Sequence, residues 1–236
     1  MTDLEQLLAL AVDDNIAWCS AICRAHGSYE IRSSFLWANL QASPPFYPNI
    51  ITRKPDAQVE VESVVSRVEM HVQAGGWGIK DSFSNLSLSA IGFERVVSGF
   101  WYGGTPAVQN IAMDWRTVQD PVQLQQWEHA WGELDVRVFP EKLLSDQRIR
   151  FWFRGEADDM RAGVITFDSG SALGISNWFS REGMPLAETG ALQAANSVSS
   201  GRPVVCWSAD DIVEQTGLSK LGPLQVWVSA PSRATD

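Results

Sequence analysis

The 236-residue sequence has few cysteines, few cations and no long apolar run. Three cysteines cannot build a complete disulfide framework, so we expect a reducing, cytoplasmic location. Lys and Arg total 18 against 28 Asp and Glu, and the formal net charge of −10 provides no basic footprint for nucleic acid or an anionic membrane surface. No run approaches the roughly 20 apolar residues of a transmembrane helix, and we expect no signal peptide because acidic residues interrupt the first apolar segment.

Several familiar catalytic and metal-binding motifs are also missing. The three histidines are scattered, and no serine stands in a Gly-x-Ser-x-Gly turn. The glycines at 75–78 lack the spacing of a dinucleotide site or the lysine of a P-loop. Cys19, Cys23 and His26 have helical spacing, but a structural zinc site needs four ligands, so we interpret the two cysteines as buried residues of an amphipathic helix. We therefore expect no metal.

The composition favours a folded chain with a sizeable core. Hydrophobic residues make up 45% of the sequence, and eleven of the residues are tryptophan. Because large aromatic side chains usually serve burial, we expect most tryptophans in a core or an interface.

The sequence contains one pattern twice. In each half, a short β-like run precedes a brief helical stretch that stops at a glycine, and a second β-like run then carries a tryptophan. The copy in the first half consists of Gly78–Asp81, Gly92-Phe93 and Trp101. The copy in the second half consists of Val204–Trp207, Gly217-Leu218 and Trp227. The identities are few, so a chance match within the general pattern of α/β proteins stays open as an alternative to duplication.

Hydrophobic periodicity predicts alternating helices and strands. The predicted helices are Asp3–Ala25, Asp56–Ala74, Asp120–Leu134 and Pro185–Ser199, and Pro121 just inside Asp120 favours a helix start there. The predicted strands are Ser34–Ala42, Asn49–Arg53, Ala107–Met113, Arg148–Arg154, Gly163–Asp168 and Ala172–Phe179. This order predicts the α/β (α+β) class.

The order of these elements, together with the closing run from Gly217 to Trp227, resembles the GNAT (acetyltransferase-like) superfamily. The resemblance covers nearly the whole chain and rests on the order of short segments. It implies two tandem GNAT-like modules, residues 1–116 and 117–236, with mixed, mostly antiparallel sheets and helices packed on them.

The resemblance also implies a binding slot for acetyl-CoA or another acyl-CoA. In that fold, two parallel strands splay apart, the pantetheine pairs with an exposed strand edge, and the next helix presents its N-terminus to the pyrophosphate. In the first half, Pro55 and Asp56 depart from the glycine-containing signature of this turn. In the second half one arginine and one glycine remain, and the implied cofactor-binding residues are Asn177, Phe179, Ser180, Arg181 and Gly183.

The catalytic residues are not assigned by the sequence. Asp81 fits a helix cap as well as a functional carboxylate, and Tyr47 is interpreted as an interface tyrosine with a satisfied hydroxyl. The first hypothesis is an acyl-CoA-dependent N-acyltransferase with a small amine or amino-acid-like acceptor. The second is a non-catalytic small-molecule or CoA-binding protein with a vestigial site, and the third is a structural or oligomer-forming module, such as a homodimer, which would explain the tryptophan excess.

Overall fold

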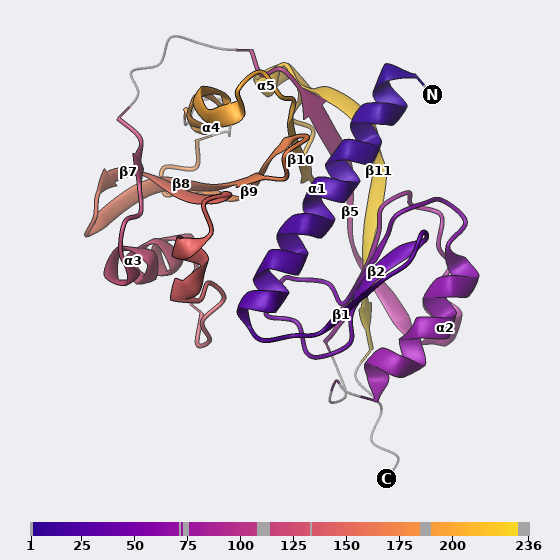
Figure 1. The fold of residues 1–236 in the computed structure, drawn as a ribbon. Coiled ribbons are helices and arrows are strands. Elements are labelled where there is room, and N and C mark those ends of the chain that lie inside the picture. The colour runs from indigo at the N-terminus through magenta and orange to yellow at the C-terminus, as the bar shows by residue number, and fades with distance from the viewer. Residues whose placement is uncertain are drawn as a thin grey trace. The chain divides into compact units, whose positions relative to one another are not determined.

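The structure, a computed structural model, describes residues 2–70, 72, 76–107, 114–132, 134–184 and 190–230. The chain divides into two compact units: unit 1 is Met1–Trp18 with Trp101–Leu221, and unit 2 is Cys19–Phe100 with Gly222–Asp236. The chain passes from one unit to the other within three elements, α1 (Asp3–Ala25), β5 (Phe93–Gly104) and β11 (Ser219–Ser229) (Figure 1). Within the described ranges, no helix combines the length and the hydropathy needed to cross a membrane.

Unit 2 contains a small mixed sheet. Its strands are β1 (Glu30–Arg32), β2 (Leu36–Asn39), β3 (Ile50–Thr52) and β4 (Gly78–Asp81), joined by parts of β5 and β11. Along the sheet, β1, β2 and β3 pair antiparallel, β3 pairs parallel with β4, and β4 pairs antiparallel with β11. The parallel pair needs a crossover connection, which α2 (Gln58–Glu69) supplies.

The core of unit 2 forms between α2 and this sheet. The valines at positions 61, 64, 65 and 68 of α2 are buried, and they belong to one cluster with Ile50, Ile79 and Trp227. The 3-10 helix η1 (Ser89–Ile91) ends at Gly92, whose φ of 88° is the left-handed conformation that favours glycine. The helix predicted from Asp56 begins two residues later, and residues 71 and 73–75 lie outside the described residues.

Unit 1 contains a second set of strands. They are β6 (Arg116–Thr117), β7 (Ile149–Glu156), β8 (Asp159–Asp168), β9 (Leu173–Ser180) and β10 (Val204–Ser208). From β6 to β9 each neighbour pairs antiparallel, whereas β9 and β10 are parallel. The helical elements are α3 (Pro121–Trp131), η2 (Glu141–Ser145), α4 (Ala191–Ser199) and α5 (Val213–Thr216), and α3 and α4 lie on opposite faces of the β7–β9 sheet (Figure 1).

An aromatic cluster joins α3 to the sheet of unit 1. Trp127 is fully buried and makes edge-on ring contacts with Phe139, Phe151 and Phe179. Its indole nitrogen donates a hydrogen bond of 2.8 Å to the backbone oxygen of Trp152, so the one polar atom of the side chain is satisfied. Most tryptophans are buried, as expected: Trp18, Trp37, Trp77, Trp101, Trp127, Trp152 and Trp227.

Most predicted elements are present. The bounds of α1 are those predicted, the alternation around Phe151 forms β7, and α5 ends at Gly217 in the left-handed conformation, as η1 does at Gly92. The mixed α/β class with mostly antiparallel pairing is confirmed.

Some boundaries differ from the prediction. The helix predicted from Pro185 begins at Ala191, after a left-handed Gly190, and residues 185–189 lie outside the described residues. The strand predicted at Ala107–Met113 also falls largely outside them, and β1 was not predicted. The module boundary at 116/117 stays a prediction, because division by compactness does not test a sequence repeat.

Candidate functional site

The two parallel strands of unit 1 separate soon after they meet. Their paired residues are Leu173 with Val204 and Gly174 with Val205. Beyond these pairs β9 continues to Ser180 and β10 to Ser208, and no further β9–β10 pairing is present in the described part of the chain. On its other side β9 stays paired with β8 as far as Ser180. One edge of β9 is therefore separated from β10, while the other edge remains paired with β8.

A β-bulge lies in the separated part of β9. Ser176 is opposite Ile165 and Phe179 is opposite Gly163, so two residues of β9 face one residue of β8. Asn177, one of the two, has a φ of 51°, the left-handed conformation that asparagine tolerates better than most residues. The bulge bends the strand locally and re-aims the backbone groups of Asn177, the first of the implied cofactor residues.

The turn after β9 carries three more of the implied cofactor residues. Ser180 closes the turn, because its backbone oxygen accepts from the Gly183 nitrogen at 3.1 Å and its Oγ accepts from the Met184 nitrogen at 3.2 Å. Gly183 has a φ of 67°, and a side chain added there would meet open space. The Arg181 guanidinium lies 3.5 Å from the Asp159 carboxylate, on the hairpin between β7 and β8.

Phe179 has a different environment from its neighbours. Its ring packs edge-on against Trp127, with 5.4 Å between ring centroids, and a Cβ added at Gly163 would lie 2.3 Å from the Phe179 ring. The side chain therefore belongs to the aromatic cluster beneath α3. The structure brings Asn177, Ser180, Arg181 and Gly183 together at the end of β9, and their role as cofactor ligands, like that of Phe179, stays a prediction.

A small cavity lies at the point where β9 and β10 part. Its volume is about 10 Å³, close to the space that one water molecule needs. Residues from α1, β9 and β10 line it, among them Asp14, Gly174, Ser176 and Cys206. Asp14 approaches the backbone closely, since a Cβ added at Gly174 would lie 1.9 Å from Asp14 Oδ2. Only glycine at 174 leaves room for this carboxyl group.

Burial controls the protonation of both titratable groups that line this cavity. Burial raises the pKa of Asp14 to about 8, and the nearby charge of Asp168 adds to the rise, while hydrogen bonds from Ser169 and the Gly174 backbone oppose it. Burial likewise raises the pKa of Cys206 to about 12. A thiol of that pKa is neutral near pH 7 and is a poor nucleophile, so Cys206 is not suited to a covalent acyl-enzyme step.

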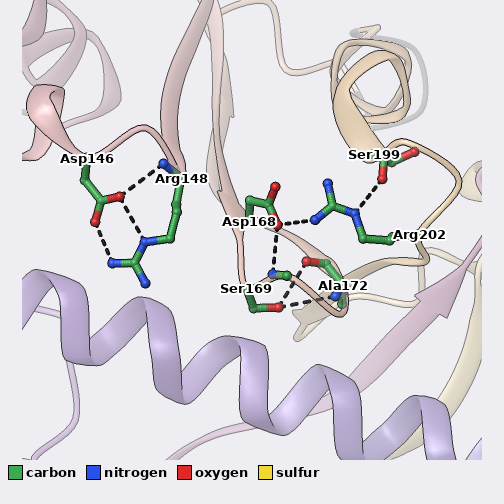
Figure 2. Close-up of polar contacts among 8 residues, drawn as sticks. Asp146, Arg148, Asp168, Ser169, Ala172, Ser199 and Arg202 are labelled. Atoms are coloured by element: carbon green, nitrogen blue, oxygen red, sulfur yellow. Dashed lines mark hydrogen bonds and ion pairs between the residues drawn. The ribbon is translucent and has the colours of Figure 1, made fainter.

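Figure 2 shows the polar contacts that fix the turn between β8 and β9. Two residues of this turn, Asp168 and Ser169, also act on Asp14. The Asp168 carboxylate forms an ion pair with Arg202 and accepts a hydrogen bond of 2.8 Å from the Gly170 nitrogen. Ser169 Oγ donates to the backbone oxygen of Ala172 at 3.0 Å. Arg202 follows α4 and donates to the backbone oxygen of Ser199, so this network ties the end of α4 to the end of β8.

The corresponding strands of unit 2 are closed instead of separated. The Thr52 hydroxyl accepts a hydrogen bond of 2.8 Å from the Ser82 nitrogen and continues the β3–β4 contact past the last strand pair. The Asp81 carboxylate accepts hydrogen bonds from the backbone nitrogens of Phe83 and Leu86, so it acts as a cap. These contacts leave unit 1 as the place for a ligand slot between parallel strands.

No cluster of three or more potential metal ligands occurs among the residues that the structure describes. Cys19 and Cys23 are both buried thiols outside any disulfide. Burial raises the pKa of Cys23 to about 12, which disfavours the thiolate that metal binding requires.

Asp14 was not among the candidate residues expected from the sequence. A signal was present, because Asp14 follows Ala11 by three residues and precedes Trp18 by four, and it therefore shares the apolar face of α1. A carboxylate at a core position of an amphipathic helix is unusual enough to mark a candidate site.

Neither a protein-family model nor a curated protein matches this sequence. Solved structures do match. A GCN5-related N-acetyltransferase from Kribbella flavida has a TM-score of 0.62 at 10% identity, covering 96% of this chain and 98% of that one. A conserved protein of unknown function from Staphylococcus epidermidis has a TM-score of 0.59 at 11% identity, covering 86% and 94%.

A third match has the same description as the first. A GCN5-related N-acetyltransferase from Sphaerobacter thermophilus has a TM-score of 0.51 at 7% identity, covering 76% of this chain and 71% of that one. At these identities the likeness concerns the fold. Together with the separated parallel strands and the bulge in β9, these matches show that the chain has the fold of the GNAT superfamily.

Proposed function

We propose that this protein is an acyl-CoA-dependent N-acyltransferase that acts on a small amine or amino-acid-like acceptor. The observation that carries the proposal is the separation of β9 from β10 after Gly174, which leaves one edge of β9 without a strand partner in the described part of the chain. Backbone N–H and C=O groups of such an edge need partners, and the amide groups of an acyl-CoA pantetheine are of the right kind.

The turn after β9 supports a phosphate position at that end of the slot. Gly183 adopts a left-handed conformation with open space beside it, and the N–H groups of Gly183 and Met184, which here donate to Ser180, are the groups that a phosphate would take over. Arg181 is paired with Asp159, so we expect binding to rest chiefly on these backbone amides. This arrangement agrees with the net charge of −10, since backbone amides bind phosphate without excess cationic side chains.

A thermal-shift titration with acetyl-CoA tests the proposal. A ligand at about a hundred times its Kd should raise the free energy of unfolding by roughly 2.7 kcal/mol. We expect Gly183→Trp to abolish this stabilisation, because the bulky side chain would occupy the phosphate turn. The matched control is Gly170→Trp, since Gly170 also has a positive φ and open space around it but lies at the opposite end of β9.

The outcomes separate the functions that the sequence leaves open. Absence of any shift at millimolar acetyl-CoA would refute the proposal. Equal loss in both glycine variants would move the phosphate site away from Gly183. A shift without release of CoA in the presence of any amine would favour the non-catalytic CoA-binding alternative. Light scattering at several protein concentrations tests the homodimer.

A further inference from the structure

Asp14 lies where β9 and β10 separate, and its carboxyl group is buried with one oxygen atom unsatisfied by the described residues. The residue is only 4% exposed. Its Oδ1 atom has no hydrogen-bond partner among the residues described, and Asp14 lines the water-sized cavity. A buried polar atom without a partner is unfavourable, so its presence beside a cavity with room for one water molecule points to a water bound there.

The position of this carboxyl group along β9 is well defined. Asp14 Oδ2 lies against the backbone of Gly174, which is the last residue of β9 paired with β10. If the phosphates of an acyl-CoA lie at the Arg181–Gly183 turn, the carrier extends back along β9 and its thioester end points toward Gly174. The thioester and Asp14 would then occupy the same end of the slot.

We propose that Asp14 accepts the proton of the acceptor amine during acyl transfer, an inference that rests on the proposed function. The amine nitrogen attacks the thioester carbonyl carbon, a C–N bond forms, and the C–S bond breaks. The proton leaves the nitrogen for the Asp14 carboxylate through a water molecule of the size that the cavity holds, and passes from there to the departing CoA thiolate. Asp14 returns to its starting state, and the step needs no further reactant.

The groups around Asp14 suit a proton acceptor. Asp168 from β8 raises the proton affinity of Asp14 and is itself held by Arg202, whereas Cys206 from β10 stays a neutral thiol. Asp13, the next acidic residue on α1, is exposed. The pKa of Asp14, about 8, lies close to working pH, where a carboxylate is a stronger base than usual and still ionises in part.

The substitution Asp14→Asn separates this role from a structural one. An asparagine side chain keeps the shape and can still hydrogen-bond with Ser169 and the Gly174 backbone, but it cannot take a proton at this pH. Asp13→Asn is the matched control, because it makes the same charge change one residue away on an exposed position. Asp14→Ser, smaller and still polar, is a second variant in case asparagine disturbs packing.

The assay follows release of CoA thiol from acetyl-CoA in the presence of a set of primary amines that includes the amino acids and simple polyamines. We expect Asp14→Asn to lower kcat at least 100-fold while the acetyl-CoA thermal shift is unchanged, and Asp13→Asn to leave both unchanged. For the unsubstituted protein, kcat/KM should rise with pH to an inflection near 8, which the residual activity of Asp14→Asn should lack.

Two results would overturn the role of Asp14 and leave cofactor binding intact. One is turnover by Asp14→Asn and Asp14→Ser within a few-fold of the unsubstituted protein. The other is a clear acetyl-CoA shift with no CoA release for any amine. A missing acetyl-CoA shift is a different failure, because it would refute the proposed function and this inference with it.

Discussion

At the scale of single residues, burial has different consequences for the two titratable groups beside the cavity. It keeps Cys206 protonated across the whole physiological range. It brings the pKa of Asp14 close to neutrality, since an ionised carboxylate loses hydration when it is buried. The same physical effect therefore makes one side chain chemically inert and gives the other a proton equilibrium near pH 8.

This equilibrium predicts how stability depends on pH. The pKa of Asp14 is about 8 in the folded protein, against about 3.9 for an unfolded aspartate. Between these values the folded state holds one more proton than the unfolded state, so the contribution of Asp14 is fully present below pH 4 and is lost as pH rises to about 8. The loss amounts to about 1.4 kcal/mol per pH unit.

Urea unfolding at several pH values between 5 and 8 measures this contribution. Asp14→Asn should lack this pH-dependent contribution to the free energy of unfolding. The variant should therefore become more stable relative to the unsubstituted protein as pH rises. Asp13→Asn should keep the original pH dependence. Parallel curves for Asp14→Asn and the unsubstituted protein would show that Asp14 titrates with an ordinary pKa.

At the scale of elements, the best-specified helix is α3, because its first turn carries its own start signal. Asp120 has an extended conformation, and its carboxylate accepts a hydrogen bond of 2.9 Å from the Gln123 nitrogen. Pro121 occupies the first helical position, where its missing N–H is of no consequence. The helix then presents Leu124 and Trp127 to the sheet, as the apolar spacing predicts.

Removing this cap should destabilise α3 and unit 1. We expect Asp120→Ala to lower the free energy of unfolding by about 1 kcal/mol, because one N–H group of the first turn loses its acceptor and a negative charge leaves the positive end of the helix. Chemical denaturation measures the change. Asp120→Asn, which retains the cap, should lose less, and an equal loss for both substitutions would contradict the capping explanation.

At the scale of the whole molecule, the compact units do not follow the order of the chain. Unit 2 takes residues from both the first half and the end of the sequence. Trp227 on β11 is opposite Ile79 on β4 and belongs to the core cluster of unit 2. The end of the chain thus completes the core that the first half begins.

A division of the chain at the predicted module boundary should therefore fail to give a stable first half. Residues 1–116 lack β11, so β4 has an unpaired edge and the core loses Trp227. We expect fragment 1–116 to show no cooperative thermal transition by circular dichroism, and co-expression with 117–236 to recover one. Cooperative unfolding of 1–116 alone, with the midpoint of the full chain, would contradict this account.

The sequence alone predicted those features that depend on neighbouring residues. Periodicity predicted α1 and β7, capping residues predicted the start of α3, and glycines predicted where η1 and α5 end. The fold class followed from the order of these elements. Apolar spacing alone did not mark the left-handed Gly190 that precedes α4, and the predicted helix start at Pro185 lies outside the described residues.

The tertiary structure decided where β9 and β10 separate, which face of α1 covers the cavity and how deeply Asp14 is buried. These features depend on contacts between residues far apart in the chain, such as Asp14 and Gly174. Local patterns specify conformation because helices and turns satisfy their backbone groups within a few residues. The environment that sets the proton affinity of a buried carboxyl group is assembled by long-range packing, which no local pattern encodes.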